Sequence, residues 1–214
     1  MSIPVSSSGT IGATDQPVAP PPRVRTVDER LTLVAVRMLI LAGTFGFAAW
    51  FFAQAFLQII NEDNKWLPVT LHRPLTAGTL EIIVMVASWL VYLWAQYGAL
   101  RSGNFRWLNR ALWLSAVLGL IALAIQVSIL HNPGFTLQDG GYVSVFIGME
   151  GVITTLLLFS LIVLFGLANR ARLGLFQTTA VAIEGFGEWW MWLTGIAAFA
   201  YANLYIVPFL HLAD

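Results

Sequence analysis

Five long apolar runs alternate with short polar segments over almost all of the chain after residue 30. They cover approximately Val34–Ile59, Leu75–Ala99, Leu108–Ile129, Tyr142–Leu167 and Thr178–Leu210. A bilayer core takes about 20 helical residues, and each run reaches that length. Because the hydrocarbon core offers no water to backbone N–H and C=O groups, each run must satisfy these groups internally as a helix. The pattern therefore predicts an all-α membrane protein with five transmembrane helices.

The composition supports this interpretation. Hydrophobic residues make up 58% of the chain and charged residues only 10%, whereas soluble domains carry about 25% charged residues. The formal net charge is zero, so no excess of positive charge favours a nucleic-acid partner. The chain has no cysteine, which excludes a disulfide and a thiolate metal site.

The positive charges are distributed unevenly between the connections. Of the 11 Lys and Arg residues, nine fall on one side of the membrane if the five helices alternate in direction. They are Arg23, Arg25, Arg30, Arg37, Arg101, Arg106, Arg110, Arg170 and Arg172, and only Lys65 and Arg73 fall on the other side. Because cytoplasmic loops carry the excess of Lys and Arg, the pattern predicts a cytoplasmic N-terminus and a C-terminus outside.

The N-terminal residues form a separate region. They are rich in Ser and Pro, including a run of three prolines, and contain too little apolar surface to offset the entropy lost on folding. We therefore expect a disordered tail over residues 1–26 and a five-helix transmembrane domain over residues 27–214. Thr26 and Glu29 have the spacing of a capping box, which places the start of the first helix at about Val27.

Glutamates interrupt the apolar runs at four positions: Glu81, Glu150, Glu184 and Glu188. An ionisable side chain within a membrane helix is costly and usually faces protein or a water-filled cavity. Glu184 and Glu188 are four residues apart and therefore share one helix face. Two interpretations stay open: protonated acids that hydrogen-bond between helices for structural reasons, or a proton path or lipid-headgroup contact. All four are candidates for a proton- or lipid-related site.

The sequence contains no arrangement typical of a catalytic or metal site. Its three histidines, His72, His131 and His211, lie at the ends of the predicted spans, and no pair has the spacing of a ligand couple. Methionines are scattered, and they more often fill gaps in a core than bind a metal. There is also no glycine-rich phosphate loop and no nucleophile elbow. We therefore expect no catalytic residue, and no metal or haem bound by this chain.

Several short stretches occur in an order that a known membrane family shares. They are Ala42–Phe47, Gly119–Gln126, Gly140–Phe146, Gly148–Ile153 and the pair Glu184 and Trp190. The first is a run of small residues and phenylalanines, and the second ends a helix with a glutamine. The third is a turn and helix start. Together they resemble subunit III of haem–copper oxidases, in its five-helix bacterial form, over about Arg37–Tyr205.

The chain departs from the pattern of that family at some of these positions. Arg37 stands where the family usually has a glutamate. The stretch Gly148–Ile153 lies where the family usually has Gly-x-His-Gly-x-His, and Glu150 and Ile153 replace the two histidines. Glu184 matches the glutamate of the family's last helix. The chain is therefore identified as a divergent member.

The resemblance implies a subunit of cytochrome c oxidase type without a redox centre of its own. Such a subunit would dock on the catalytic subunit I, which carries haem and copper, beside the other subunits of a respiratory complex. It would hold phospholipid in a cleft between helix groups and support proton uptake and translocation. It would be a multi-pass protein of the bacterial inner membrane and serve electron transport in aerobic respiration.

Two alternatives stay open. Within the family, the chain could be an accessory subunit of a nitric oxide reductase or a quinol oxidase. From another class, a small proton-coupled transporter could use Glu81, Glu150 and Glu188 to carry protons. Transporters tend to show internal repeats and broken helices, and this sequence shows neither a clear repeat nor a proline in the middle of a span.

Overall fold

The computed structural model describes residues 25–60, 66, 74–99, 103–135, 140–176 and 180–210. Within these ranges the chain is almost entirely helical and contains no β-strand. The all-α class predicted from the apolar runs is therefore confirmed for the described residues. Most of the predicted disordered tail, up to residue 24, lies outside them, so that expectation stays a prediction.

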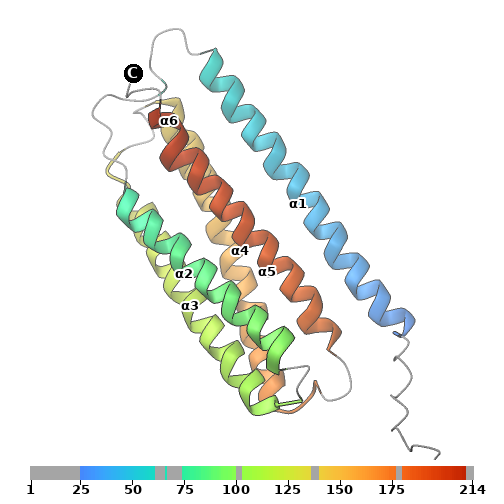
Figure 1. The fold of residues 1–214 in the computed structure, drawn as a ribbon. Helices are drawn as coiled ribbons and strands as arrows, with labels where there is room; N and C mark the ends of the chain where they lie inside the picture. Colours follow the sequence, from blue (N-terminus) through green and yellow to red (C-terminus); the bar gives the residue numbers. More distant parts are fainter. Residues whose placement is uncertain are drawn as a thin grey trace, which may run out of the picture.

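Five long helices follow one another along the chain (Figure 1). They are α1 (Val27–Ile59), α2 (Leu75–Trp94), α3 (Phe105–His131), α4 (Gly141–Arg172) and α5 (Val181–Tyr201). α2 continues into a π-helical segment, η1 (Ala95–Ala99), and α5 continues through η2 (Ala202–Ile206) into the short α6 (Val207–Leu210). The helices coincide with the five predicted spans, although residues 177–179, where the fifth was expected to begin, lie outside the described ranges.

The helices have the length and composition of membrane spans. Within the described part of the chain, four of them, α1 to α4, are long and apolar enough to cross a membrane. α5 carries two glutamates, and its helical run reaches from Val181 to Leu210 through η2 and α6. Since the arrangement of helices does not distinguish the two membrane faces, the cytoplasmic N-terminus and the outside C-terminus stay a prediction.

α1 begins where its sequence predicts. The Thr26 hydroxyl accepts a hydrogen bond from the Glu29 backbone N–H at 3.3 Å, and the Glu29 carboxylate accepts one from the Thr26 N–H at 2.9 Å. This reciprocal pair satisfies two donors that the first helical turn leaves without a partner. The capping box thus fixes the start of α1 at Val27.

The core of the bundle lies between α2, α3, α4 and α5, and α1 lies at its edge beside α5 (Figure 1). In the most apolar 18-residue stretch of α1, only 11% of the residues are buried, compared with 39% in the corresponding stretches of α3 and α4. α2 and α3 are joined by two buried serines: the Ser88 hydroxyl donates to the Ser115 carbonyl at 2.8 Å, and the Ser115 hydroxyl donates to the Ser88 carbonyl at 3.0 Å. α1 is therefore the helix most dependent on a few specific contacts.

Two glycines allow tryptophans to lie close to a helix backbone. A Cβ on Gly43 of α1 would lie 2.6 Å from the Trp192 ring of α5, and one on Gly148 of α4 would lie 2.7 Å from the Trp50 ring of α1. The Trp192 indole also donates to the Thr44 hydroxyl at 2.9 Å. These contacts fit the general role of small residues at membrane helix interfaces, and they fix the distance of α1 from its neighbours.

Pro208 lies just after the π-helical segment η2 and removes one helical hydrogen bond from the turn before it. Pro208 has no N–H, so the carbonyl of Leu204, four residues earlier, cannot receive the usual helical hydrogen bond. The Tyr142 hydroxyl of α4 donates to that carbonyl instead, at 2.7 Å. The same segment carries Tyr205, whose buried ring lies against Gly78 of α2. The irregular turn thus joins α5 to α4 and directs a tyrosine into the bundle.

Candidate functional site

The glutamates predicted as site residues form two pairs at opposite ends of the bundle. Glu184 and Glu188 lie near the start of α5, and their carboxylates contact arginines at α1. Glu81 and Glu150 lie near the starts of α2 and α4, at the other end, and interact electrostatically with each other. The predicted shared face of Glu184 and Glu188 is confirmed, whereas the electrostatic interaction of Glu81 with Glu150 was not predicted.

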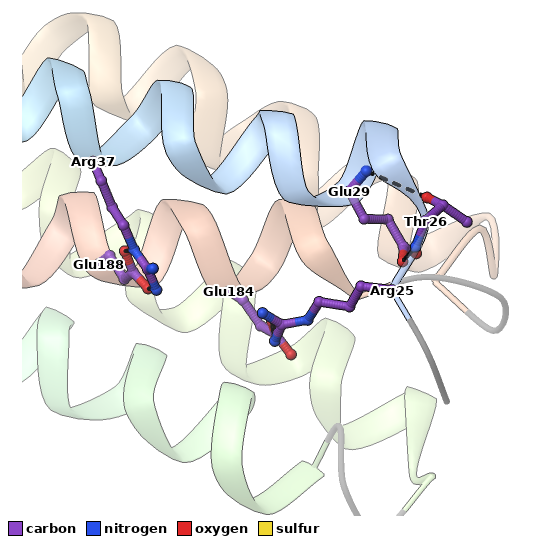
Figure 2. A network of polar contacts seen from close by, with 6 residues as sticks. All are labelled: Arg25, Thr26, Glu29, Arg37, Glu184 and Glu188. Atoms are coloured by element: carbon purple, nitrogen blue, oxygen red, sulfur yellow. Dashed lines mark hydrogen bonds and ion pairs between the residues drawn. The ribbon is translucent and has the colours of Figure 1, made fainter. Parts of the chain in front are cut away.

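Arg37 and Glu188 form a two-point ion pair between α1 and α5 (Figure 2). The Arg37 Nε donates to Glu188 Oε2 at 2.9 Å, and Nη2 donates to Oε1 at 2.7 Å. Such parallel bonds fix the geometry of both side chains as well as neutralising their charge. The Arg37 side chain is 60% exposed and that of Glu188 32%, so the pair lies at the edge of the interface, where it faces lipid or another protein.

A second ion pair lies at the very start of α1. Figure 2 shows the Arg25 side chain reaching from the residues before α1 to Glu184 in the first turn of α5. The Nη2–Oε2 distance is 2.7 Å. Together the two pairs attach the first part of α1 to one face of α5. For Glu184 and Glu188, this geometry favours ionised carboxylates over the protonated acids that one interpretation of the sequence expected.

An apolar groove runs along α1, between that helix and α4 and α5. Four cavities of about 450, 290, 490 and 390 Å³ follow one another along it. Leu39 and Trp189 line both the first and the second cavity, and Trp50 lines the second, third and fourth. Arg170, near the end of α4, and Ser160 line the first cavity. The groove is therefore apolar along its length, with a cation at the end near the α1–α5 ion pairs.

The second pair of glutamates is enclosed by the bundle. Glu81 is 3% exposed and Glu150 4%, and Gln126 of α3 is fully buried beside them. The Gln126 Nε2 donates to the Glu150 carboxyl and, at 3.3 Å, to the Glu150 backbone carbonyl. Three helices thus contribute one polar side chain each to a cluster in the core. We call Glu81, Gln126 and Glu150 the carboxyl cluster.

Tyrosines surround the carboxyl cluster. Tyr205 of η2 interacts with Glu150 through its hydroxyl and also interacts electrostatically with Glu81. Tyr142 lies nearby and is held by its hydrogen bond to Leu204. One turn before η2, the Tyr201 hydroxyl lies 2.6 Å from the Thr79 hydroxyl of α2. The cluster is therefore bordered by hydroxyl groups and aromatic rings.

No metal centre is formed by the residues that the structure describes. They contain no group of three or more His, Cys, Asp or Glu side chains placed to hold a metal ion. His131 lies at the end of α3, and His72 and His211 lie outside the described residues. The expectation that this chain binds no haem or metal stays a prediction.

The amino-acid sequence is similar to those of known proteins. No family model matches the chain, but it is 24% identical over 176 residues to cytochrome c oxidase subunit 3 of Rattus norvegicus, a match covering 78% of this chain and 66% of the rat protein. It is 27% identical over 181 residues to the protein of the same name from Damaliscus lunatus, covering 82% and 67%. The chain is a divergent relative of cytochrome c oxidase subunit 3. It spans about two thirds or less of the length of the curated relatives it matches.

Two of the departures from the subunit 3 pattern, Arg37 and Glu150, have polar partners in the structure. Arg37, which stands where the resemblance places a glutamate, is paired with Glu188 of α5. Glu150, which stands where it places a histidine, accepts from Gln126. Each of these two replacements thus forms a hydrogen bond with a polar side chain of another helix.

Sequence reasoning found the acids but missed their partners. Arg37 was noted as a departure from the family, and Gln126 as part of a motif, but neither was expected to contact a glutamate. The available signal was the presence of Arg37 and Gln126 within apolar spans, because polar side chains there almost always face a polar partner. The pairing itself depends on helix packing, which spacing along one helix does not show.

Proposed function

We propose that this chain is a non-catalytic accessory subunit of a haem–copper terminal oxidase in a bacterial inner membrane. The observation that supports this most directly is the similarity, over 78–82% of the chain, to proteins named cytochrome c oxidase subunit 3. In this proposal the chain docks on subunit I, and haem and copper belong to partner subunits. Its own role is to stabilise the catalytic subunit, retain lipid and sustain proton uptake.

The direct test is isolation of the chain with its neighbours. A tagged chain, extracted from its own cells in a mild detergent, should copurify with haem-bearing subunits and give their absorption spectrum. The chain produced alone should give no Soret band. Purification of a stable chain without haem proteins, from cells that express the full complex, would contradict the proposal. Oxidation of cytochrome c, oxidation of quinol and reduction of nitric oxide by the isolated complex distinguish the three kinds of enzyme.

The orientation is part of this proposal. The nine-to-two distribution of positive charges supports an N-terminus in the cytoplasm, which places the α1–α5 ion pairs near the cytoplasmic face and the carboxyl cluster in the outer half. Reporter fusions after Gly103 and after Asp139 should be cytoplasmic and external, respectively. The reverse labelling would invert the whole assignment.

The groove along α1 supports the lipid part of the proposal. Its apolar walls follow α1 over several turns, as an acyl chain requires, and Arg170 offers a guanidinium to a phosphate at one end. A phospholipid with its headgroup at Arg170 and a chain along Leu39 and Trp50 fits this distribution of polar and apolar groups.

Lipid retention can be measured with a matched pair of variants. Arg170→Ala removes the cation that lines the groove, whereas Arg172→Ala removes an exposed cation on the same helix that does not line it. Mass spectrometry of lipids extracted from the purified complex should show a severalfold loss of phospholipid for Arg170→Ala alone. Equal lipid content in both variants would argue against this site.

A further inference from the structure

The two glutamates of the carboxyl cluster differ from Glu184 and Glu188 in the charged groups around them. Glu184 and Glu188 each have an arginine within 2.7 Å. Within the described ranges, neither Glu81 nor Glu150 forms an ion pair with a Lys, Arg or His side chain. Both acids are nevertheless almost fully buried and close enough to interact electrostatically. Two carboxylates in this setting would be two uncompensated charges in the core of a membrane bundle.

The energetics exclude that state. Burial of an ionised carboxylate without an opposite charge costs many kcal/mol, and two like charges at one site raise the cost further. Among the described residues, the other titratable groups of this region are the phenol of Tyr205 in η2 and those of Tyr142 and Tyr201 beside it, while α3 contributes the neutral amide of Gln126. Since no described group supplies the opposite charge, a bound cation is needed, and the proton is the smallest.

The amide of Gln126 points to a further ligand. Its Nε2 donates to Glu150, but its Oε1 is buried and, of all the described polar groups, none forms a hydrogen bond with it. A buried amide oxygen without a donor costs about 1–3 kcal/mol, and an O–H group would satisfy it. A protonated carboxyl is such a donor. The π-helical η2 brings the Tyr205 hydroxyl to the same place, and such segments are frequent at functional sites.

We propose that Glu81 and Glu150 form a proton-binding site inside the bundle, at which the two carboxyls together hold at least one exchangeable proton at neutral pH. Gln126 and Tyr205 are its positioning residues. The site is separate from the groove and from the arginine pairs, and the inference does not depend on membership of an oxidase.

Infrared spectroscopy of the full chain in lipid nanodiscs tests the site. With isotope-labelled glutamate and at about pH 8, where ordinary carboxyls are ionised, the unmodified chain should retain a protonated-carboxyl band that shifts with the label and in heavy water. Glu81→Gln combined with Glu150→Gln should remove that band. Glu188→Gln, which alters a carboxylate paired with Arg37, should leave it unchanged.

The measurement decides the question even if a variant fails to fold, because the first observation uses the unmodified chain. Absence of any labelled protonated-carboxyl band there would overturn the proposal. A band that the folded double variant retains in full would overturn it as well. A band that shifts with the label but not in heavy water would show that the proton does not exchange.

Discussion

The glutamates near the two ends of this bundle differ in their burial and in the charges around them. Near the start of α5, Glu184 and Glu188 are partly exposed and each is neutralised by an arginine from α1 or just before it. In the carboxyl cluster, Glu81 and Glu150 are enclosed, Glu150 accepts a hydrogen bond from the neutral amide of Gln126, and neither acid has an arginine partner among the described residues. The comparison shows that an acid in a membrane helix can be made tolerable by an opposite charge or by a proton.

The difference also separates two structural tasks. The arginine pairs link α1, the least buried helix, to the rest of the bundle, so their task is attachment. The carboxyl cluster lies between α2, α3 and α4, where α3 already packs closely against both of the others, so attachment does not explain it. A chemical role is therefore better sought in the cluster, and a docking or assembly role in the pairs.

The largest effect is expected within the carboxyl cluster. Glu150→Leu and Gln126→Leu should each destabilise the chain by about 1–3 kcal/mol, because each leaves a buried polar group without its partner. The double variant should recover part of that loss, since both polar groups are then gone. Thermal unfolding in a fixed detergent measures all three. Strictly additive losses would show that Gln126 and Glu150 are not coupled.

The tyrosine that supports η2 should matter nearly as much. Tyr142→Phe removes a buried hydrogen bond to the Leu204 carbonyl, which Pro208 already deprives of the usual donor four residues on, at a cost of about 1–3 kcal/mol. The control is Tyr92→Phe: the Tyr92 hydroxyl donates to the Ile183 carbonyl at 2.7 Å, but that carbonyl keeps its helical donor from Gly187. Tyr92→Phe should therefore cost clearly less in the same unfolding assay. Equal losses would contradict the role assigned to Pro208.

The yield of an engineered disulfide can measure how firmly α1 is attached to α5, because the chain has no cysteine of its own. A Cβ on Gly185 would lie 4.0 Å from the Val36 Cβ, which is within the range of a disulfide. Oxidation of a Val36→Cys, Gly185→Cys chain should therefore cross-link α1 to α5. Adding Arg37→Glu, which places two like charges at the pair, should lower the yield severalfold.

The charge-swapped chain is the control for that experiment. Arg37→Glu combined with Glu188→Arg restores opposite charges across the same interface and should restore much of the cross-link. An unchanged yield in Arg37→Glu alone would show that the ion pair does not hold α1 in place.

The smallest effect is expected at the Arg25–Glu184 pair, which has one hydrogen bond where Arg37–Glu188 has two. Glu184→Gln should change stability by only about 0–1 kcal/mol, because exposed ion pairs contribute little. If the charge of Glu184 supports the oxidase, the same variant should still shorten sustained turnover of the complex. Glu62→Gln, in a connection outside the described residues, is the comparison variant. Identical turnover of both variants would remove Glu184 from the candidate site.

The sequence predicted the helices well because their signals are local. Apolar runs of membrane length, and the Thr26–Glu29 capping box, depend on neighbours in the chain. Pro208 is also a local signal, because its spacing to Leu204 is fixed, but neither its effect on that carbonyl nor the π-helical form of η2 was predicted. η1 contains no proline, and no feature of its sequence distinguishes it from the helix before it.

The contacts between helices could not be predicted in this way. Arg37 and Glu188 are 151 residues apart, and Gln126 and Glu150 lie on different helices. Which faces meet depends on the packing of side chains around all the helices, and every span here is apolar on most faces. The polar residues could be recognised as unusual, but their pairing required the three-dimensional arrangement.

The attachment of α1 has a consequence for how the protein is made. α1 is synthesised before its main neighbour α5, with three helices between them in the chain. At about 5–20 residues per second, the ribosome needs about 8–30 s to pass from Arg37 to Glu188. During that time the guanidinium of a newly inserted α1 must extend along its own helix to the headgroup region, as long basic side chains do. Insertion of α5 then supplies Glu188 as a partner for the arginine, so the ion pair forms only after the three intervening helices have been made.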